Sequence, residues 1–239
     1  MELSSVEPSV LGGLVARERR SDALALEAPA LGRDYDYRRF CTTAWKVGNF
    51  LHHVGVRSGV AVAVAPDPVP EPVLSLFGAA LLGAPVRFLD GDPDEDTRAV
   101  VVPTGGENVD LPPGGQRVVY GDPPEDPSTS YFERDVWSQN PTEPPDPVAP
   151  GDVALRADGE YTHRDLLVAA GSVLEEWGLE AGESVAVRAP LTHPGTVAAG
   201  VVAPLLAGGV VLLPDGDAVG DYAVGAGPEP GVDPEDVLG

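Results

Sequence analysis

Two short segments of the chain are apolar at every position, without the alternation of polar residues that marks a half-exposed strand. They are Val60–Val64 and Val185–Val187, and each is followed by an Ala- and Gly-rich apolar run of helical length. Strands of this kind are buried on both faces, which is typical of a parallel sheet covered by helices. The pattern therefore predicts an α/β protein.

The same order of elements occurs twice. Residues 34–92 and 158–217 each run through a helical segment, a Gly-x-x-x-Gly turn, an apolar strand, an apolar helix and a second apolar strand. Self-similarity over a segment of this length indicates a duplicated unit. We expect two αβ half-domains with mainly parallel sheets.

Capping residues mark where the first helix of each copy begins, and glycines mark where it ends. Asp36 is placed to cap the first helix, and Thr162 with Asp165 three residues later matches a capping box. Gly55 and Gly178 fall where a helix ends in a left-handed residue. These signals predict helices that begin near residues 37 and 163.

The chain divides by composition into four parts. We assign 1–102 to the first αβ half and 151–217 to the second. Between them, 103–150 is a Pro-rich connector with one short strand, at Arg117–Tyr120, and 218–239 is expected to be a disordered acidic tail.

One stretch is long and apolar enough to be tested as a membrane span. Gly195–Leu213 carries no charged residue, but Pro204 and the pair Gly208-Gly209 interrupt it. We expect a helix over residues 194–206 and a buried strand over 210–213, and no contact with a membrane. The first residues carry neither a basic nor an apolar export signal, so a cytoplasmic location is expected.

The net charge of the chain limits the classes of molecule that it can bind. The chain has 15 basic and 38 acidic residues and a net charge of −23. Such a surface repels phosphate backbones, which argues against nucleic-acid binding. Lys46 is the only lysine, and an acidic, lysine-poor composition suits a salt-rich cytoplasm, the alternative being an ordinary acidic protein. Cys41 is the only cysteine, which excludes an intrachain disulfide.

The ordered motifs resemble the N-terminal domain of the AMP-forming acyl-CoA synthetases, members of the adenylate-forming superfamily. Residues 21–26 are similar to the family's first strand, residues 161–167 to the segment after its phosphate loop, and residues 190–195 to its next motif. The resemblance covers roughly residues 9–217. It implies that the two half-domains are layered αβαβα.

The resemblance also implies a substrate pocket. In the family, the motif matched by residues 190–195 places a histidine or an aromatic side chain against the substrate. Here that position is His193, and Thr192 and Gly195 flank it as candidate substrate-binding residues. The alternative is a histidine in a turn whose hydrogen bonds are made with the backbone.

The family's phosphate-binding loop is missing. A Ser/Thr/Gly-rich loop ending in Pro-Lys-Gly is expected before Tyr161, but residues 153–160 are short and carry Asp158 and Glu160. Lys46 lies in the first helix and does not correspond to the family's catalytic lysine. We therefore assign no catalytic residue, no cofactor and no metal ligand. The acidic run Asp90–Asp96 lacks calcium-loop spacing and is expected to be a solvated turn.

Two functional hypotheses follow. The first is a non-catalytic remnant of an adenylate-forming enzyme, a pseudoenzyme that binds a small molecule or a protein, with a synthetase as one candidate protein partner. The alternative is an acyl-CoA or acetyl-CoA ligase whose phosphate loop and lysine come from a separate chain. ATP and CoA are cofactors only under that alternative.

Overall fold

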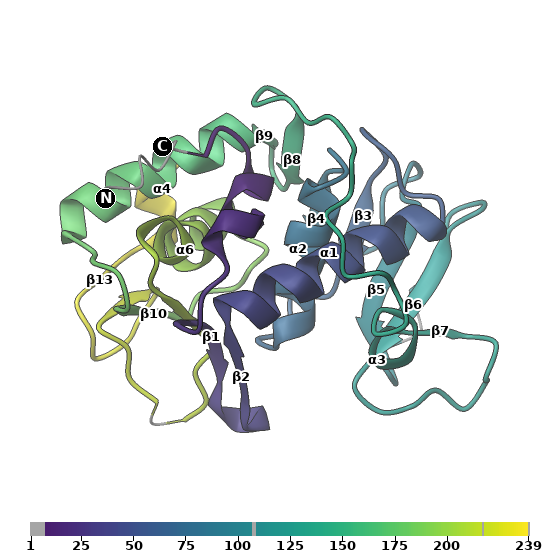
Figure 1. The fold of residues 1–239 in the computed structure, drawn as a ribbon, viewed down its shortest axis with the longest axis horizontal. Helices are drawn as coiled ribbons and strands as arrows, with labels where there is room; N and C mark the ends of the chain where they lie inside the picture. The colour runs from purple at the N-terminus through teal and green to yellow at the C-terminus, as the bar shows by residue number, and fades with distance from the viewer. Residues whose placement is uncertain (1–7, 107–108, 217, 239) are drawn as a thin grey trace.

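Two mixed, mainly parallel β-sheets with helices packed on them build the protein (Figure 1). The computed structural model describes residues 8–106, 109–216 and 218–238. The predicted α/β class, with duplicated αβ half-domains and mainly parallel sheets, is confirmed.

The first sheet has seven strands in the order β7-β6-β5-β3-β4-β8-β9. Their bounds are β3 (Val62–Val64), β4 (Val86–Phe88), β5 (Ala99–Pro103), β6 (Gln116–Tyr120), β7 (Ser130–Tyr131), β8 (Val153–Arg156) and β9 (Glu160–Thr162). The second sheet has six strands in the order β13-β12-β10-β11-β1-β2. They are β1 (Leu24–Ala28), β2 (Arg33–Asp36), β10 (Ser184–Val187), β11 (Val210–Leu212), β12 (Tyr222–Val224) and β13 (Gly231–Val232).

The helices differ in length and type. The α-helices are α1 (Tyr37–His53), α2 (Pro70–Ala80), α3 (Phe132–Asp135), α4 (His163–Trp177), α5 (Pro194–Thr196) and α6 (Ala203–Ala207). A π-helical segment, η4 (Val197–Val202), joins α5 to α6. Short 3₁₀ helices are η1 (Leu11–Val15), η2 (Arg17–Arg19), η3 (Pro29–Leu31) and η5 (Pro234–Asp236).

The predicted helix caps are confirmed. A carboxylate oxygen of Asp36 accepts a hydrogen bond from the Arg39 N–H at 2.6 Å and begins α1. Thr162 and Asp165 form the reciprocal capping box of α4. Gly178 ends α4 in the left-handed conformation, with φ of 64°. These local signals place both helices where the sequence puts them.

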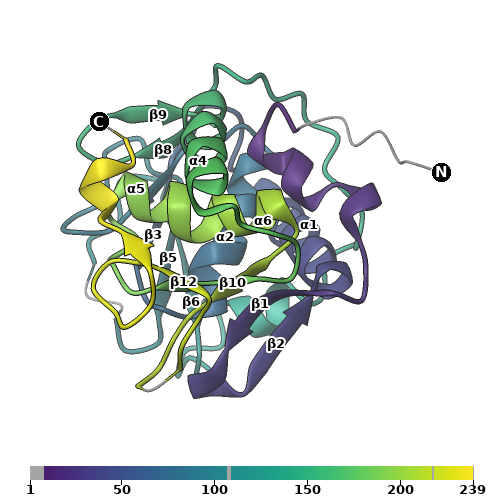
Figure 2. The ribbon, with the colours of Figure 1, turned by 90° about the vertical axis from the view of Figure 1, so that its left-hand side faces the viewer.

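The two halves exchange their N-terminal hairpins. The hairpin β1–β2 precedes α1, yet β1 pairs in parallel with β11 of the second sheet. The hairpin β8–β9 precedes α4, yet β8 pairs in parallel with β4 of the first sheet. Meanwhile α1 packs on α2, and α4 packs on η4 and α6 (Figure 2). Each sheet is therefore completed by the other half of the chain.

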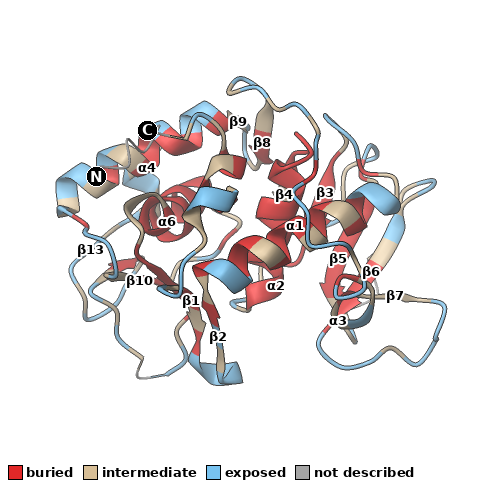
Figure 3. Cartoon of the chain, in the orientation of Figure 1, coloured by how far each residue is buried: buried red, intermediate tan, exposed pale blue. Residues whose placement is uncertain are grey.

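A single hydrophobic cluster connects the two halves. It includes residues from both sheets and from α1, α2, α4, η4 and α6. All eleven residues of α2 are buried (Figure 3). At the crossing of α1 and α2, a Cβ on Gly48 would lie 3.1 Å from the carbonyl oxygen of Gly78, so the glycines allow the two backbones to approach closely.

No helix residue takes part in the small clusters on the opposite faces of the sheets, among the residues that the structure describes. One cluster is Ala63, Ala65, Val100, Val102 and Val119, and the other is Ala186, Leu212 and Ala223. The strands there are joined by loops, for example residues 89–98 between β4 and β5. The helices therefore lie on the sides of the sheets that share the main core.

The segment expected to be a disordered acidic tail is instead folded over its described residues. Tyr222 pairs with Val185, which adds β12 to the second sheet, and its ring stacks on Trp177 at 5.0 Å. Both carboxylate oxygens of Glu229 accept hydrogen bonds from Arg188. Strands of two or three residues are too short for sequence periodicity to reveal, and the Pro-rich connector likewise holds β7 in addition to β6.

The apolar stretch after residue 194 forms the predicted helix and strand. The helical run α5–η4–α6 ends at Gly208, which has φ of 82°, and β11 follows in the second sheet. No helix among the described residues has both the length and the apolar composition needed to cross a membrane.

Candidate functional site

A cavity of about 410 Å³ lies where the carboxyl ends of β4 and β8 meet the start of α5. Ligands of open α/β sheets characteristically bind at the carboxyl ends of the strands. Three segments far apart in sequence supply its walls, and the lining residues are Arg87, Phe88, Asp90, Ala157, Asp158, Thr192, His193 and Pro194. We refer to it as the His193 pocket.

His193 both lines this pocket and caps a helix. Its Nδ1 accepts a hydrogen bond from the Gly195 N–H at 3.2 Å, and its own N–H donates to the carbonyl of Pro190. With Nδ1 acting as an acceptor, the neutral imidazole carries its proton on Nε2, which leaves an N–H donor for a ligand.

Of the three residues implied by the resemblance, the structure brings two to the pocket. Thr192 and His193 line it, but Gly195 does not. A Cβ on Gly195 would overlap the carbonyl oxygen of Pro234 in η5. Gly195 is thus placed for close packing against the C-terminal segment, a contact that only the folded chain reveals.

The charged lining of the pocket is predominantly acidic. The guanidinium of Arg87 lies 3.0 Å from Asp94 and 3.4 Å from Asp90, so two carboxylates already neutralise it. Asp158 adds a further negative charge. Sequence reasoning did not single out Arg87, although a charged residue between the apolar Val86 and Phe88 was a usable signal. This lining suits a neutral or cationic ligand better than a phosphate.

The turn at the position where the family resemblance predicts a phosphate loop is very short. Residues 157–159 connect β8 to β9, and the Ala157 N–H donates to the carbonyl of Gly159 at 2.9 Å. The Tyr161 hydroxyl donates to Asp158 at 2.9 Å. The turn is therefore closed by its own hydrogen bonds, and a carboxylate occupies its tip.

The N-terminus of α4 has no spare donors. The N–H of Thr162 donates to the Asp165 carboxylate, and the N–H of Asp165 donates to the Thr162 hydroxyl. The His163 N–H donates to the carbonyl of Asp152 and the Arg164 N–H to that of Pro150. A helix N-terminus binds phosphate through free N–H groups, and here the chain itself uses all four.

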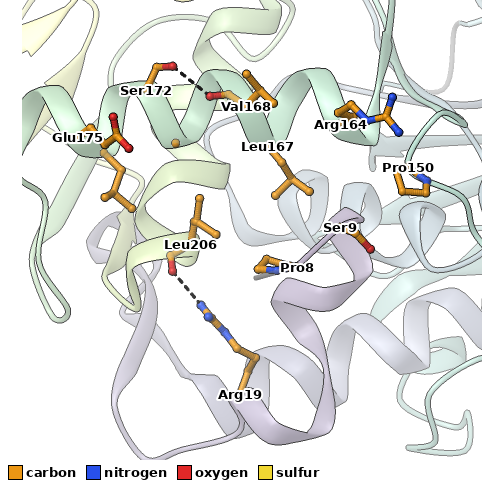
Figure 4. A pocket seen from close by; sticks show the side chains of 12 residues that line it. Pro8, Ser9, Arg19, Pro150, Arg164, Leu167, Val168, Ser172, Glu175 and Leu206 are labelled. Atoms are coloured by element: carbon orange, nitrogen blue, oxygen red, sulfur yellow. Dashed lines mark hydrogen bonds between the residues drawn. The ribbon is translucent and has the colours of Figure 1, made fainter. Parts of the chain in front are cut away.

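A larger groove of about 720 Å³ runs along α4 (Figure 4). Leu167 and Leu206 project into it, and Arg19 donates to the carbonyl of Leu206 at 3.5 Å. The sequence offered one signal for this groove, because the apolar Val168 interrupts the polar face of the helix. In the structure, Val168 is 63% exposed. We call this feature the α4 groove.

Neither a metal centre nor a reactive thiol is formed by the described residues. No three His, Cys, Asp or Glu side chains among them come together as ligands for a metal ion. Burial raises the pKa of the Cys41 thiol to about 12, which disfavours the nucleophilic thiolate.

Comparisons with known proteins give matches in structure only. No protein-family model and no curated protein sequence matches this chain. The solved structure of the anthranilate CoA ligase AuaEII in complex with anthranoyl-AMP superimposes with a TM-score of 0.78 at 20% identity, covering 94% of this chain and 51% of that one.

Two further structures show the same relationship. The N-terminal domain of FACL13 from Mycobacterium tuberculosis matches with a TM-score of 0.72 at 15% identity, over 90% of this chain and 62% of its own. MatB from Rhodopseudomonas palustris matches with the same TM-score and identity, over 90% of this chain and 49% of its own.

This chain therefore spans about half to three-fifths of the length of these structures. At such low identity the likeness establishes the fold, which is the one that the sequence motifs predicted.

Proposed function

We propose that this chain is a non-catalytic member of the adenylate-forming superfamily, a remnant of an acyl-CoA synthetase that works as a binding module. The similarity of its fold to CoA ligases supports the superfamily, and the state of the phosphate-binding elements supports the loss of catalysis. The proposal includes a cytoplasmic location and a surface adapted to high salt.

The N-terminus of α4 is the observation that carries this proposal. All four N–H groups that a phosphate would need there are bonded within the chain, two of them to the side chains of Thr162 and Asp165. A triphosphate would have to break these bonds and approach the carboxylates of Asp158 and Asp165. Like charges at contact distance repel by about 1 kcal/mol per pair even in water.

The His193 pocket provides the binding function. Its volume suits a small organic molecule, and its polar groups are the Thr192 hydroxyl, the His193 Nε2–H and the carboxylates of Asp90 and Asp158. A ligand with an amine or several hydroxyl groups would pair with these side chains. A phosphate or a carboxylate would face two aspartates and an arginine that is already paired.

Calorimetry and thermal unfolding test the proposal directly. The protein is titrated with ATP, AMP and an acyl-CoA in the presence of Mg²⁺ and high KCl, and pyrophosphate release is followed with a panel of carboxylic acids. We expect no heat of binding, no rise in melting temperature and no pyrophosphate. A ligand that binds the native state must raise the melting temperature, so an increase with ATP would refute the proposal.

A second arm asks whether any turnover belongs to this chain. Should pyrophosphate appear, His193→Ala distinguishes a site in this protein from a contaminating enzyme. Loss of turnover in this variant, with the melting temperature unchanged, would show that the chain is a compact ligase.

The alternative function, an acyl-CoA or acetyl-CoA ligase completed by a separate chain, draws on the incomplete match to the ligases. This chain covers only 51% of the anthranilate CoA ligase that it resembles. Under this alternative a synthetase fragment is the partner and supplies the phosphate loop and a lysine. Co-expression with such a fragment would then produce adenylation that neither chain shows alone.

A further inference from the structure

The exposed face of α4 has a symmetric pattern. Arg164, Val168, Gly171 and Glu175 follow one another at intervals of four, three and four residues and form one stripe along the α4 groove. This spacing averages about 3.7 residues, close to the 3.6 residues of one α-helical turn, so the four residues lie along one face of α4. From Arg164 to Glu175 the stripe covers about 16 Å of helix.

This stripe of residues is complementary to the same stripe of a second copy whose α4 runs antiparallel. A two-fold axis between residues 169 and 170 would place Arg164 opposite Glu175 of a second copy, and Val168 opposite Gly171 of that copy. At both ends of the stripe an arginine then lies opposite a glutamate. At its centre the Val168 side chain lies opposite a glycine, which has no side chain. A two-fold interface requires one patch that complements itself in this way.

The part of the chain that the structure describes offers these groups no partner. Within the described residues, neither Arg164 nor Glu175 forms an ion pair. Val168 is 63% exposed, and a Cβ on Gly171 would meet no atom within 4 Å. Figure 4 shows Arg164 toward one end of the groove and Glu175 toward the other, with Val168 between them on the helix.

We propose that the α4 groove is a dimer interface in which α4 packs antiparallel against α4 of a second copy. Arg164 of each copy pairs with Glu175 of the other, and Val168 fills the space beside the opposite Gly171. The apolar side chains of Leu167, Leu174 and Leu206 form the floor against which the helices pack. This inference concerns a different surface from the His193 pocket and does not depend on the proposed function.

The net charge makes this association dependent on salt. Two copies that each carry −23 repel at long range, and the Debye length falls from about 10 Å at 0.1 M to about 3 Å at 1 M salt. The two ion pairs are in contact and are screened less. We expect a micromolar dimer, because a single helix pair lies at the small end of interface sizes, and we expect KCl to strengthen it.

Sedimentation equilibrium over a range of protein and KCl concentrations tests the interface. Val168→Glu is expected to weaken dimerisation at least about tenfold. Val219→Glu is the matched control, because Val219 is 62% exposed and the change in charge is the same. It should leave the dimer within about twofold of the unchanged protein.

Charge reversal supplies the sharper test. Arg164→Glu makes each copy more negative and Glu175→Arg makes it less negative, yet each should weaken the dimer about tenfold because it places like charges opposite each other. The double variant should restore the dimer to within about threefold. Both changes suit the helix dipole of α4, so the monomer should stay folded, which the melting temperature verifies.

A protein that remains monomeric at all concentrations and salt conditions would overturn the proposal. A dimer unaffected by Val168→Glu, or one that weakens with Arg164→Glu and strengthens with Glu175→Arg, would also overturn it, since the latter reports only net charge.

Discussion

The backbone N–H of Leu11 donates a hydrogen bond to Nδ1 of His163 at 3.2 Å, although 152 positions separate the two residues. His163 is fully buried at the start of α4, and its Nε2 has no hydrogen-bond partner in the described part of the chain. This contact attaches the N-terminal helix η1 to the second half through an uncharged imidazole. A proton on Nδ1 would break it.

The stability of the protein should therefore fall in mild acid. Burial lowers the pKa of His163 from 6.5 to about 4, so the unfolded chain binds the proton more tightly than the folded chain. The free energy of unfolding should decrease as the pH falls from about 6.5 to about 4, by up to about 3 kcal/mol. Urea unfolding across this range measures it.

The control is His163→Gln, which keeps a hydrogen-bonding group but does not titrate. Carboxylates titrate over the same range in both proteins, so the difference between the variant and the unchanged protein isolates His163. Parallel stability curves for the two proteins would contradict the prediction.

Removing Arg33 should destabilise the fold more than neutralising its partner. Arg33 of β2 lies 2.6 Å from Glu71 of α2, whose side chain is 2% exposed, and the pair joins the exchanged hairpin to the first half. Arg33→Ala leaves a buried carboxylate uncompensated and should cost about 2–3 kcal/mol, whereas Glu71→Gln should cost about 1 kcal/mol. Thermal unfolding of the two variants measures which substitution causes the larger loss of stability.

Arg38→Ala is the matched control for Arg33. Arg38 pairs with Asp22 at 2.8 Å, but both side chains are largely exposed, so its removal should leave the free energy of unfolding nearly unchanged. Equal losses for the two arginine variants would show that burial of Glu71 does not govern the effect.

Gly195→Ala should loosen the C-terminal segment. The added Cβ would overlap the carbonyl oxygen of Pro234, and backbone atoms cannot move aside as cheaply as a side chain. We expect a loss of about 2 kcal/mol and faster amide exchange in η5. Gly151→Ala is the control, because a Cβ there meets nothing within 4 Å. Unchanged exchange in η5 would argue against the packing role.

Substitution of Gly178 should act through the backbone alone. Its φ is 64°, and a Cβ would meet no atom within 4 Å, so strain rather than a clash determines the cost. Gly178→Val should lose about 1 kcal/mol or more, and Gly178→Asn less, because asparagine tolerates the left-handed conformation. Equal stability of both variants in urea unfolding would refute the capping role.

The α4 groove and the His193 pocket were harder to predict from the sequence than the helices were. Pocket residues come from β4, the β8–β9 turn and the start of α5, and only the last group, Thr192, His193 and Pro194, belongs to a recognisable motif. Arg87 and Asp158 reach the same cavity because β4 and β8 are neighbours in one sheet. Nothing in the order of residues specifies that neighbour.

The sequence by itself determined the local structure and the class of fold. Apolar runs such as Val62–Val64 are buried strands wherever they lie, and Asp36, Thr162 and Gly178 act on backbone groups within a few residues. These effects need no tertiary contact, so the helix ends and the duplicated αβ plan could be predicted.

Only the tertiary structure decided which strands lie side by side. Leu26 pairs with Val211 and Leu155 with Val86, so each hairpin joins the sheet of the other half. Hydrophobic patterning requires a strand to be buried but does not distinguish one apolar neighbour from another. Long-range contacts, such as those of Leu11 with His163 and Arg33 with Glu71, depend on that choice. They form because the assembled sheets bring these residues together, and no local signal encodes them.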